Sequence, residues 1–212
     1  MNCRYNILLL LLIFTTSVFG QDRKNYFPLW TNHQENSNIH GISIGLGSFG
    51  DVYKNTYTNG IRIEIIGAGI LVPLIPNSPI AANDSIFESL RMLPISEKIN
   101  GLNLSTTGTF CNCTTNGLSA GFIGQINYKI NGFSSSLMMN YAQIHNGFQM
   151  AIINESYLLN GLQFGLYNYG HKTKGVQFGL FNKSENLRGI QIGLWNVNQK
   201  RKLPLINWNF KK

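Results

Sequence analysis

The sequence predicts an all-β fold: an antiparallel meander of strands, built from repeats of 14–15 residues, that closes into a barrel. Three observations lead to this prediction. A short motif recurs at a constant spacing, the side chains within each copy alternate between two faces, and the residues between the copies are polar. A β-solenoid, in which each repeat forms one coil, is the alternative that the constant repeat length favours.

The repeated motif is G-h-Q-h-G-h-h-N, where h is an apolar residue. Its four clearest copies are GFQMAIIN at 147, GLQFGLYN at 161, GVQFGLFN at 175 and GIQIGLWN at 189. Weaker copies begin at 41, 60, 101, 117 and 132. Apolar side chains of one copy share a face, as Leu162, Phe164 and Leu166 do, and two glycines per copy oppose a helix.

Asn-Gly pairs open six of the copies, and both residue types tolerate positive φ, so these pairs predict tight turns between strands. The asparagines of these pairs are Asn59, Asn100, Asn116, Asn131, Asn146 and Asn160.

The choice between barrel and solenoid depends on the stretches YGHKTK, KSENLR and VNQKRK, which follow three of the copies. A solenoid coil must also bury residues on this return side, and these stretches can bury almost nothing. We therefore predict that these stretches are polar connections between antiparallel strands. One face of the barrel is then apolar and meets lipid, and the other face carries Gly, Gln, Ser, Arg62 and Glu64. Arg62 and Glu64 are expected to form an ion pair in the lumen or in solvent.

The solenoid alternative predicts two ladders of stacked amide side chains. In this arrangement the repeated Gln and aromatic rows form a flat surface for a glycan or a protein partner. The ladder members are Gln149, Gln163, Gln177 and Gln191, and Asn154, Asn168, Asn182 and Asn196.

The chain divides into three segments. Within residues 1–20, Arg4 is followed by a leucine-rich apolar run that ends in uncharged residues, which is typical of a secretory signal peptide. Residues 21–40 form an N-terminal extension, and residues 41–212 form the repeat-built β domain.

An insertion at 77–98 interrupts the repeats and is predicted to contain one short helix. Ser85 and Glu88 have the spacing of a capping box, an apolar stripe follows, and Pro94 ends it. We expect this helix to cover an exposed sheet edge, and the alternative is that it plugs or caps the β structure.

The charge distribution gives no sign of a nucleic-acid partner. There are 17 basic and 9 acidic residues, but the basic residues cluster only at 200–202 and 211–212. Cys111 and Cys113 are too few for a disulfide framework or a metal site, so we expect a thiol pair at a strand end or a local bridge.

No motif supports a cofactor, metal or catalytic site. The segment GLGSFGDVYK at 45–54 matches a glycine-rich phosphate loop, but the lysine, H-R-D and D-F-G elements of a kinase are missing. His40, His145 and His171 are the only histidines considered for catalysis, and no G-x-S-x-G accompanies them.

Aromatic residues occupy one position of three successive copies, as Tyr167, Phe181 and Trp195. Such a row is a stacking surface for sugars, a packing stripe, or a belt at a membrane interface.

The units GLQFGLYN, GVQFGLFN and GIQIGLWN, followed by LPLINWNF, resemble the bacterial surface-repeat family known from spirochaetes and Bacteroidota. The similarity covers residues 147 to 210. The resemblance implies export to the envelope or the cell surface and supplies no catalytic residues.

These observations predict a non-enzymatic bacterial cell-envelope protein, an outer-membrane-associated β-barrel with a structural or surface role and outer-membrane lipid as its partner. The alternative is a secreted β-solenoid that binds a glycan or a protein. A lipid hydrolase built on a small barrel, with one of the three histidines at its rim, is the minor alternative.

Overall fold

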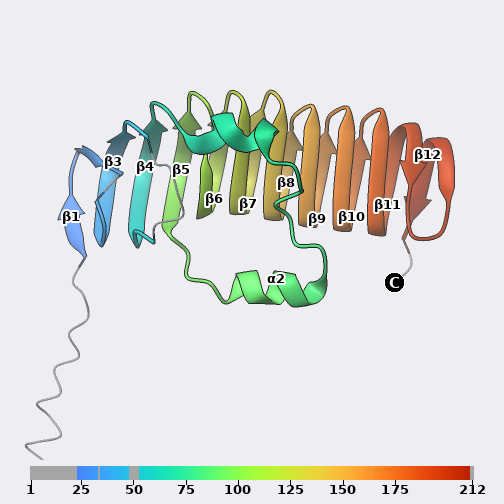
Figure 1. Ribbon diagram of the computed structural model, residues 1–212, viewed down its shortest axis with the longest axis horizontal. Helices are drawn as coiled ribbons and strands as arrows, with labels where there is room; N and C mark the ends of the chain where they lie inside the picture. Colours follow the sequence, from blue (N-terminus) through green and yellow to red (C-terminus); the bar gives the residue numbers. More distant parts are fainter. Residues whose placement is uncertain (1–22, 33, 48–52, 211–212) are drawn as a thin grey trace, which may run out of the picture.

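The computed structural model describes residues 23–32, 34–47 and 53–210, and these residues form a β-solenoid of about 11 turns (Figure 1). The strands are β1 (Lys24–Tyr26), β2 (Leu29–Thr31), β3 (Ser37–Gly45), β4 (Thr56–Glu64), β5 (Glu97–Ser105), β6 (Phe110–Gly121), β7 (Gly124–Ser136), β8 (Met139–Met150), β9 (Ile153–Phe164), β10 (Tyr167–Phe178), β11 (Phe181–Val197) and β12 (Lys202–Asn209). From β3 to β12 the strands lie side by side in sequence order, and β1 and β2 both pair with β3.

The predicted antiparallel barrel is wrong, and the solenoid alternative is confirmed. Every neighbouring pair from β3 to β11 is parallel, and equivalent repeat positions face each other, as Gly161, Gly175 and Gly189 do. Only β12 pairs antiparallel, with β11. A closed meander requires antiparallel neighbours throughout and a pairing between first and last strands.

The physical reason for this correction lies in the polar return stretches. They do bury side chains on the return side of each coil, for example Thr173 in β10, and Ser184 and Leu187 in β11. The interior also contains amides that hydrogen-bond from one coil to the next, as Asn168 does to Asn182 at 2.8 Å, so a solenoid interior does not need to be apolar. The polarity of these stretches was therefore no evidence against a coil.

Each coil bends at its motif glycine while the strand continues through the bend. The φ angles are 134° at Gly147, 142° at Gly161 and 136° at Gly175, in the region that favours glycine. A Cβ at Gly175 would lie 1.9 Å from the carbonyl oxygen of Gly161. The Asn-Gly pairs thus mark bends within parallel strands, so the predicted tight turns between strands are wrong.

The insertion contains a 3₁₀ helix, η1 (Ala68–Leu74), and the predicted α-helix, α2 (Asp84–Arg91). The helix is confirmed, but its cap differs: the Oδ1 of Asn83 accepts a hydrogen bond from the Ile86 amide at 2.9 Å. Phe87 joins a buried cluster with residues of β7, β8 and β9, which include Tyr157. The insertion therefore covers a face in the middle of the sheet, and the expectation that it covers an edge is wrong.

The ends of the solenoid differ in strand direction. At the N-terminal end, β1 and β2 pair parallel with β3, so strands already form within the segment predicted as an extension. The predicted signal peptide, residues 1–20, lies outside the described residues. No helix in the described part of the chain is long and apolar enough to cross a membrane.

Candidate binding site: an apolar edge of the solenoid

The interior of the C-terminal coils is filled by a ladder of glutamine amides. The Nε2 of Gln163 donates to the Oε1 of Gln149 at 2.9 Å, Gln177 donates to Gln163 at 2.7 Å, and Gln191 donates to Gln177 at 2.8 Å. All four side chains are buried. The predicted Gln ladder is confirmed, but the Gln row lies inside the coils, so it cannot form the flat binding surface expected for it.

The predicted asparagine ladder is confirmed beside the glutamines. The Nδ2 of Asn154 donates to the Oδ1 of Asn168 at 3.0 Å, and the Asn168–Asn182 and Asn182–Asn196 bonds are both 2.8 Å. Because amides occupy the interior positions of each motif, the alternating apolar residues must face outward.

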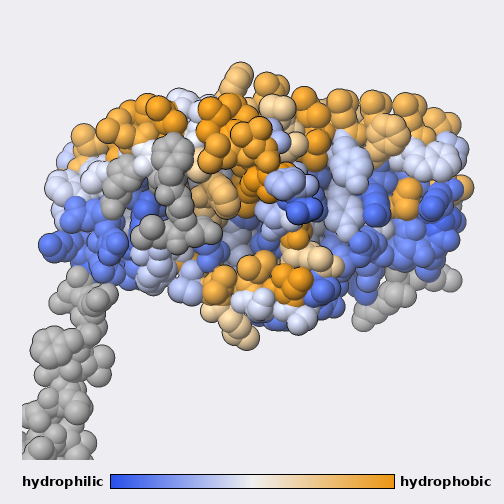
Figure 2. All heavy atoms as spheres, in the orientation of Figure 1, coloured by the Kyte–Doolittle hydropathy of each residue, from blue (hydrophilic) through white to orange (hydrophobic). Residues whose placement is uncertain are grey.

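These outward residues form a surface that we call the apolar edge. In the C-terminal coils it consists of the third, fifth and sixth positions after each motif glycine. They are Met150, Phe164, Phe178 and Ile192; Ile152, Leu166, Leu180 and Leu194; and Ile153, Tyr167, Phe181 and Trp195. The same rows continue back to β3, and no Asp, Glu, Lys or Arg occupies any of these positions. Figure 2 shows the resulting hydrophobic margin along one side of the molecule.

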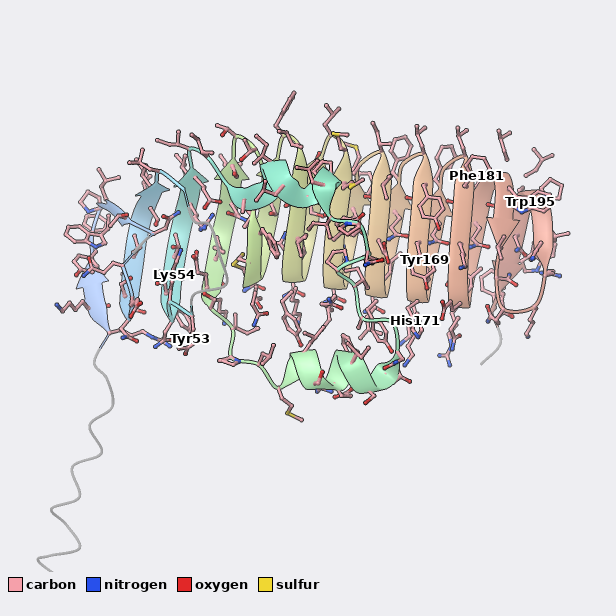
Figure 3. The ribbon with its side chains drawn as sticks, viewed as in Figure 1. Tyr53, Lys54, Tyr169, His171, Phe181 and Trp195 are labelled. Atoms are coloured by element: carbon pink, nitrogen blue, oxygen red, sulfur yellow. A yellow bond between two sulfur atoms is a disulfide. The ribbon has the colours of Figure 1, made fainter. Side chains whose placement is uncertain are left out.

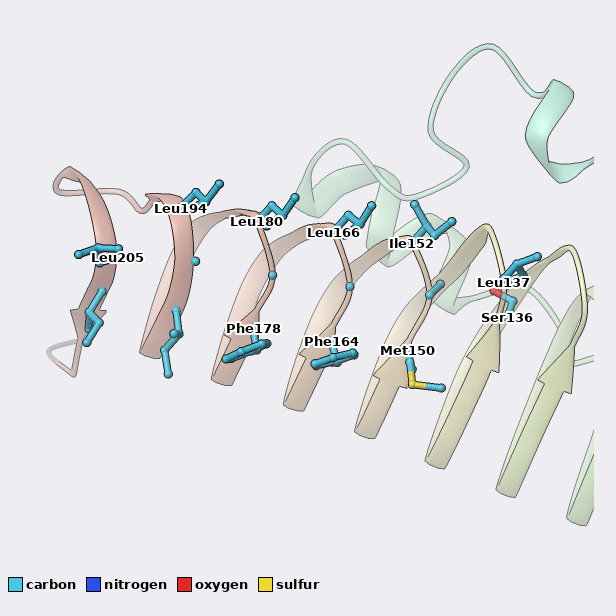
Figure 4. Close-up of a pocket in the computed structure, with 16 residues that line it drawn as sticks. Ser136, Leu137, Met150, Ile152, Phe164, Leu166, Phe178, Leu180, Leu194 and Leu205 are labelled. Atoms are coloured by element: carbon cyan, nitrogen blue, oxygen red, sulfur yellow. The ribbon is translucent and has the colours of Figure 1, made fainter.

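The apolar edge is hollowed along its length. A cavity of about 700 Å³ lies between the Phe164–Phe178 row and the Leu166–Leu180 row (Figure 4). A second cavity, of about 570 Å³, extends toward β4 and shares Ser136, Leu137 and Met150 with the first. The two hollows therefore form one groove that runs parallel to the solenoid axis.

The chain turns sharply at the apolar edge, and in the last four copies a small residue stands four positions after the motif glycine: Ala151, Gly165, Gly179 and Gly193. A Cβ at Gly179 would lie 2.2 Å from the Gly165 carbonyl oxygen and 2.5 Å from the Nδ2 of Asn168. The backbone at the turn is paired between coils: the Phe181 amide donates to the Leu166 carbonyl at 2.8 Å, and the Trp195 amide to the Leu180 carbonyl at 2.9 Å. The side chains of the groove are therefore apolar, and these two backbone amides of its turns are already hydrogen-bonded within the solenoid.

The opposite side of the coil, which we call the polar edge, is the row that precedes the motif glycines. Six asparagine side chains stack there, with Nδ2–Oδ1 distances of 2.6–2.7 Å. The row consists of His40, Asn59, Asn100, Asn116, Asn131, Asn146, Asn160, Lys174 and Arg188. The solenoid is therefore amphipathic about its long axis.

The three candidate catalytic histidines lie in three different coils. His40 is exposed on β3, and the Nδ1 of His171, on β10, is 2.8 Å from the Oε2 of Glu185. His145, on β8, is inside the coil with its Nε2 2.7 Å from the Ser134 hydroxyl. Burial lowers the pKa of His145 to about 3, so this imidazole is neutral. No substrate can reach the buried Ser134–His145 pair without opening the coil.

A buried ion network fills the interior of β4 and β5. The Nε of Arg62 is 2.7 Å from the Oε2 of Glu97, its Nη1 is 3.4 Å from Glu64, and the Nζ of Lys54 is 3.0 Å from the Oε1 of Glu97. Burial opposes ionisation of Glu97, but Arg62 and Lys54 together keep its pKa below the usual value. The predicted lumenal or solvent position of the Arg62–Glu64 pair is wrong, because all four side chains are buried.

Cys111 and Cys113 form a disulfide, the local bridge expected as one of two outcomes. It lies where the β6–β7 register shifts, between Cys111 and Thr114. No group of three or more His, Cys, Asp or Glu side chains in residues 23–32, 34–47 and 53–210 could hold a metal ion. Of the glycine-rich segment at 45–54, Gly45 belongs to β3 and residues 48–52 lie outside the described residues.

The aromatic row predicted from the motif faces outward. Tyr167, Phe181 and Trp195 are 39%, 52% and 45% exposed. Figure 3 shows Phe181 and Trp195 near the apolar edge, at the top of the view, and His171 farther from this edge, toward α2. The groove beside this row was not predicted from the sequence, although the small residues four positions after the glycines of the last four copies were a visible signal.

Comparison of the chain with family models, with curated proteins and with solved structures found no match in any of the three.

Proposed function

We propose that this chain is an exported, non-catalytic protein of the bacterial cell envelope, that its β-solenoid is a binding module, and that the apolar edge is the binding surface. The observation that carries the proposal is the apolar edge itself. A soluble monomer rarely exposes a contiguous apolar patch larger than roughly a few hundred Å² without a binding role. Here uncharged rows run from β3 to β11.

Export is supported by two independent features. The first 20 residues have the pattern of a secretory signal peptide. The Cys111–Cys113 disulfide suits an oxidising compartment outside the cytoplasm. The resemblance of the C-terminal repeats to bacterial surface repeats agrees with the same location.

A non-catalytic role is supported by the distribution of reactive side chains. The three candidate histidines lie in three different coils, and the one that contacts a serine hydroxyl is buried with a strongly lowered pKa. The envelope lipid hydrolase considered from the sequence also relied on a barrel rim, and the solenoid has none.

The polar edge supports a second candidate, glycan binding. Within its asparagine ladder each inner amide donates one N–H to the preceding asparagine and accepts one from the next, so it retains a second N–H for a sugar hydroxyl. If a glycan binds there, Asn131→Ala with Asn146→Ala abolishes retention on a polysaccharide column and leaves envelope binding unchanged.

The proposal is tested by sedimentation with isolated bacterial outer membranes. The variant Leu166→Ser/Leu180→Ser/Leu194→Ser changes three exposed leucines of the apolar edge. We expect at least about tenfold less sedimented protein, because hydrophobic contact area is lost. The matched control is Asn160→Ser/Lys174→Ser/Arg188→Ser, which changes the polar edge of the same stretch of solenoid. Equal sedimentation of the two variants would refute the apolar edge as the binding surface.

A further inference from the structure

The chemistry of the groove restricts what can fill it. Its C-terminal section has Ser136 as its only polar side chain, and no charged side chain lines it. Several amides of the turns are paired with carbonyls of a neighbouring coil, as the Leu166–Ile152 bond of 2.9 Å illustrates. A peptide or a sugar placed there would lose its hydrogen bonds to water without replacement, at a cost of roughly 2–7 kcal/mol per polar group on transfer scales.

The shape of the groove opposes a second copy of the chain as the occupant. A symmetric pair would set the same surface of both copies face to face. The hollow of about 700 Å³ would then meet an identical hollow, and the leucine rows would hold the floors apart. Such an interface leaves a void where close packing is needed.

Hydrocarbon satisfies both constraints, because it needs no hydrogen bonds and adapts to a linear groove. The groove spans at least the four coil steps from Leu137 to Leu194, roughly 19 Å at the usual strand spacing. Next to the leucine row stand Tyr167 and Trp195, residue types that concentrate at the boundary between acyl chains and headgroups.

We infer that the apolar edge binds the acyl chains of a lipid bilayer, with the solenoid axis in the membrane plane and the polar edge toward water. This inference rests on the proposed function and names the partner of the same surface. The leucine row enters the outer acyl layer, as the apolar face of an amphipathic helix does. The amide ladders stay inside the coil, so docking does not bring these amides into contact with lipid.

The experiment uses Trp195 as a reporter, with Trp30→Phe and Trp208→Phe removing the other two tryptophans. The protein is mixed with neutral phosphatidylcholine vesicles, plain or with brominated acyl chains. We expect a blue shift with plain vesicles and quenching with brominated ones. Binding should not change between low and high salt, because the edge carries no charge.

Two variants of the reporter protein complete the design. Leu180→Ser/Leu194→Ser should lower the partition coefficient about tenfold or more, and the matched Lys174→Ser/Arg188→Ser should not change it. Circular dichroism establishes that each variant is folded, and the single change Leu194→Ser, at a side chain that is 59% exposed, provides a milder version with a smaller drop.

Three outcomes would overturn the inference. Edge-dependent sedimentation with outer membranes, combined with no quenching by brominated vesicles, would identify a protein partner and leave the proposed function standing. Leucine-dependent dimers in light scattering, without vesicle binding, would identify a second copy as the occupant. Loss of edge dependence in both assays would remove the proposed function together with the inference.

Discussion

The N-terminal and C-terminal coils share one backbone geometry and differ in what they enclose. In β4 and β5 the interior holds a network of ionised side chains centred on Arg62, whereas from β8 to β11 it holds neutral amide ladders. The polarity of the groove lining also differs between the two halves. Thr106 and Ser135 line its N-terminal part, and Phe164 and Phe178 line its C-terminal part.

This difference shows that the coil is specified by a few positions and that the others are free to vary. The motif glycine has positive φ in both halves, at Gly101 (134°) and at Gly175 (136°). Interior chemistry can change from ion pairs to amides as long as the partners match between neighbouring coils. The outer rows can then change independently, which allows one half to be more apolar than the other.

The largest loss of stability is expected when Arg62, the centre of the N-terminal ion network, is replaced. Arg62→Met removes the buried cation that contacts both Glu64 and Glu97, and we expect a loss of about 3–5 kcal/mol in the free energy of unfolding. Denaturant unfolding measures this loss. The double variant Arg62→Met/Glu97→Gln restores charge balance and should lose less than the single one. An equal or greater loss in the double variant would contradict the network's role.

The next prediction tests whether the two halves share one geometry. Gly101→Ala and Gly175→Ala each place a Cβ about 2 Å from a carbonyl oxygen of the preceding coil, at positive φ. We expect both to cost about 3–4 kcal/mol, from backbone strain together with overpacking. Thermal unfolding of the two variants should shift by similar amounts. A harmless change at either glycine would show that the halves bend differently.

A smaller effect distinguishes the middle of the amide ladder from its end. Gln177→Leu leaves the Oε1 of Gln163 and the Lys183 carbonyl without their donor, at a cost of about 2–3 kcal/mol. Gln191 ends the ladder, and its own Oε1 has no partner within the described residues. Gln191→Leu should therefore destabilise less than Gln177→Leu. The reverse order in denaturant melts would argue against a continuous ladder.

The smallest effect concerns pH and the buried His145. Its folded pKa of about 3 lies below the unfolded value of about 6.5, so only the unfolded chain gains a proton between these values. The free energy of unfolding is therefore highest above pH 6.5 and decreases as the pH is lowered, by about 2 kcal/mol between pH 7 and pH 5.

The control for this pH effect is His145→Thr, because threonine occupies the same inner row at Thr115 and Thr173. This variant should be nearly flat in stability between pH 7 and pH 5. A variant that retained the full slope would assign the pH dependence to another group.

Much of this comparison could be read from the sequence. The alternation of side chains, the outward aromatic row and the amide ladders of the solenoid alternative all follow from the repeat. The choice of a barrel failed because it assumed that a coil needs an apolar interior, whereas Thr173 and Asn168 fill the interior with polar groups. The ion network was only half visible, because Glu97 lies 35 positions from Arg62 along the chain. The groove depends on the alignment of coils, which no single copy reveals.

The central claim, that equivalent leucines of successive coils line up on one edge, is tested most directly by two nitroxide labels. They are placed at Leu166→Cys and Leu180→Cys, with the Cys111–Cys113 disulfide intact. In the solenoid these positions are neighbours, about 4.8 Å apart at the usual strand spacing, so strong spin–spin broadening is expected. In an antiparallel meander they would lie at opposite ends of adjacent strands. An unbroadened spectrum would contradict the account.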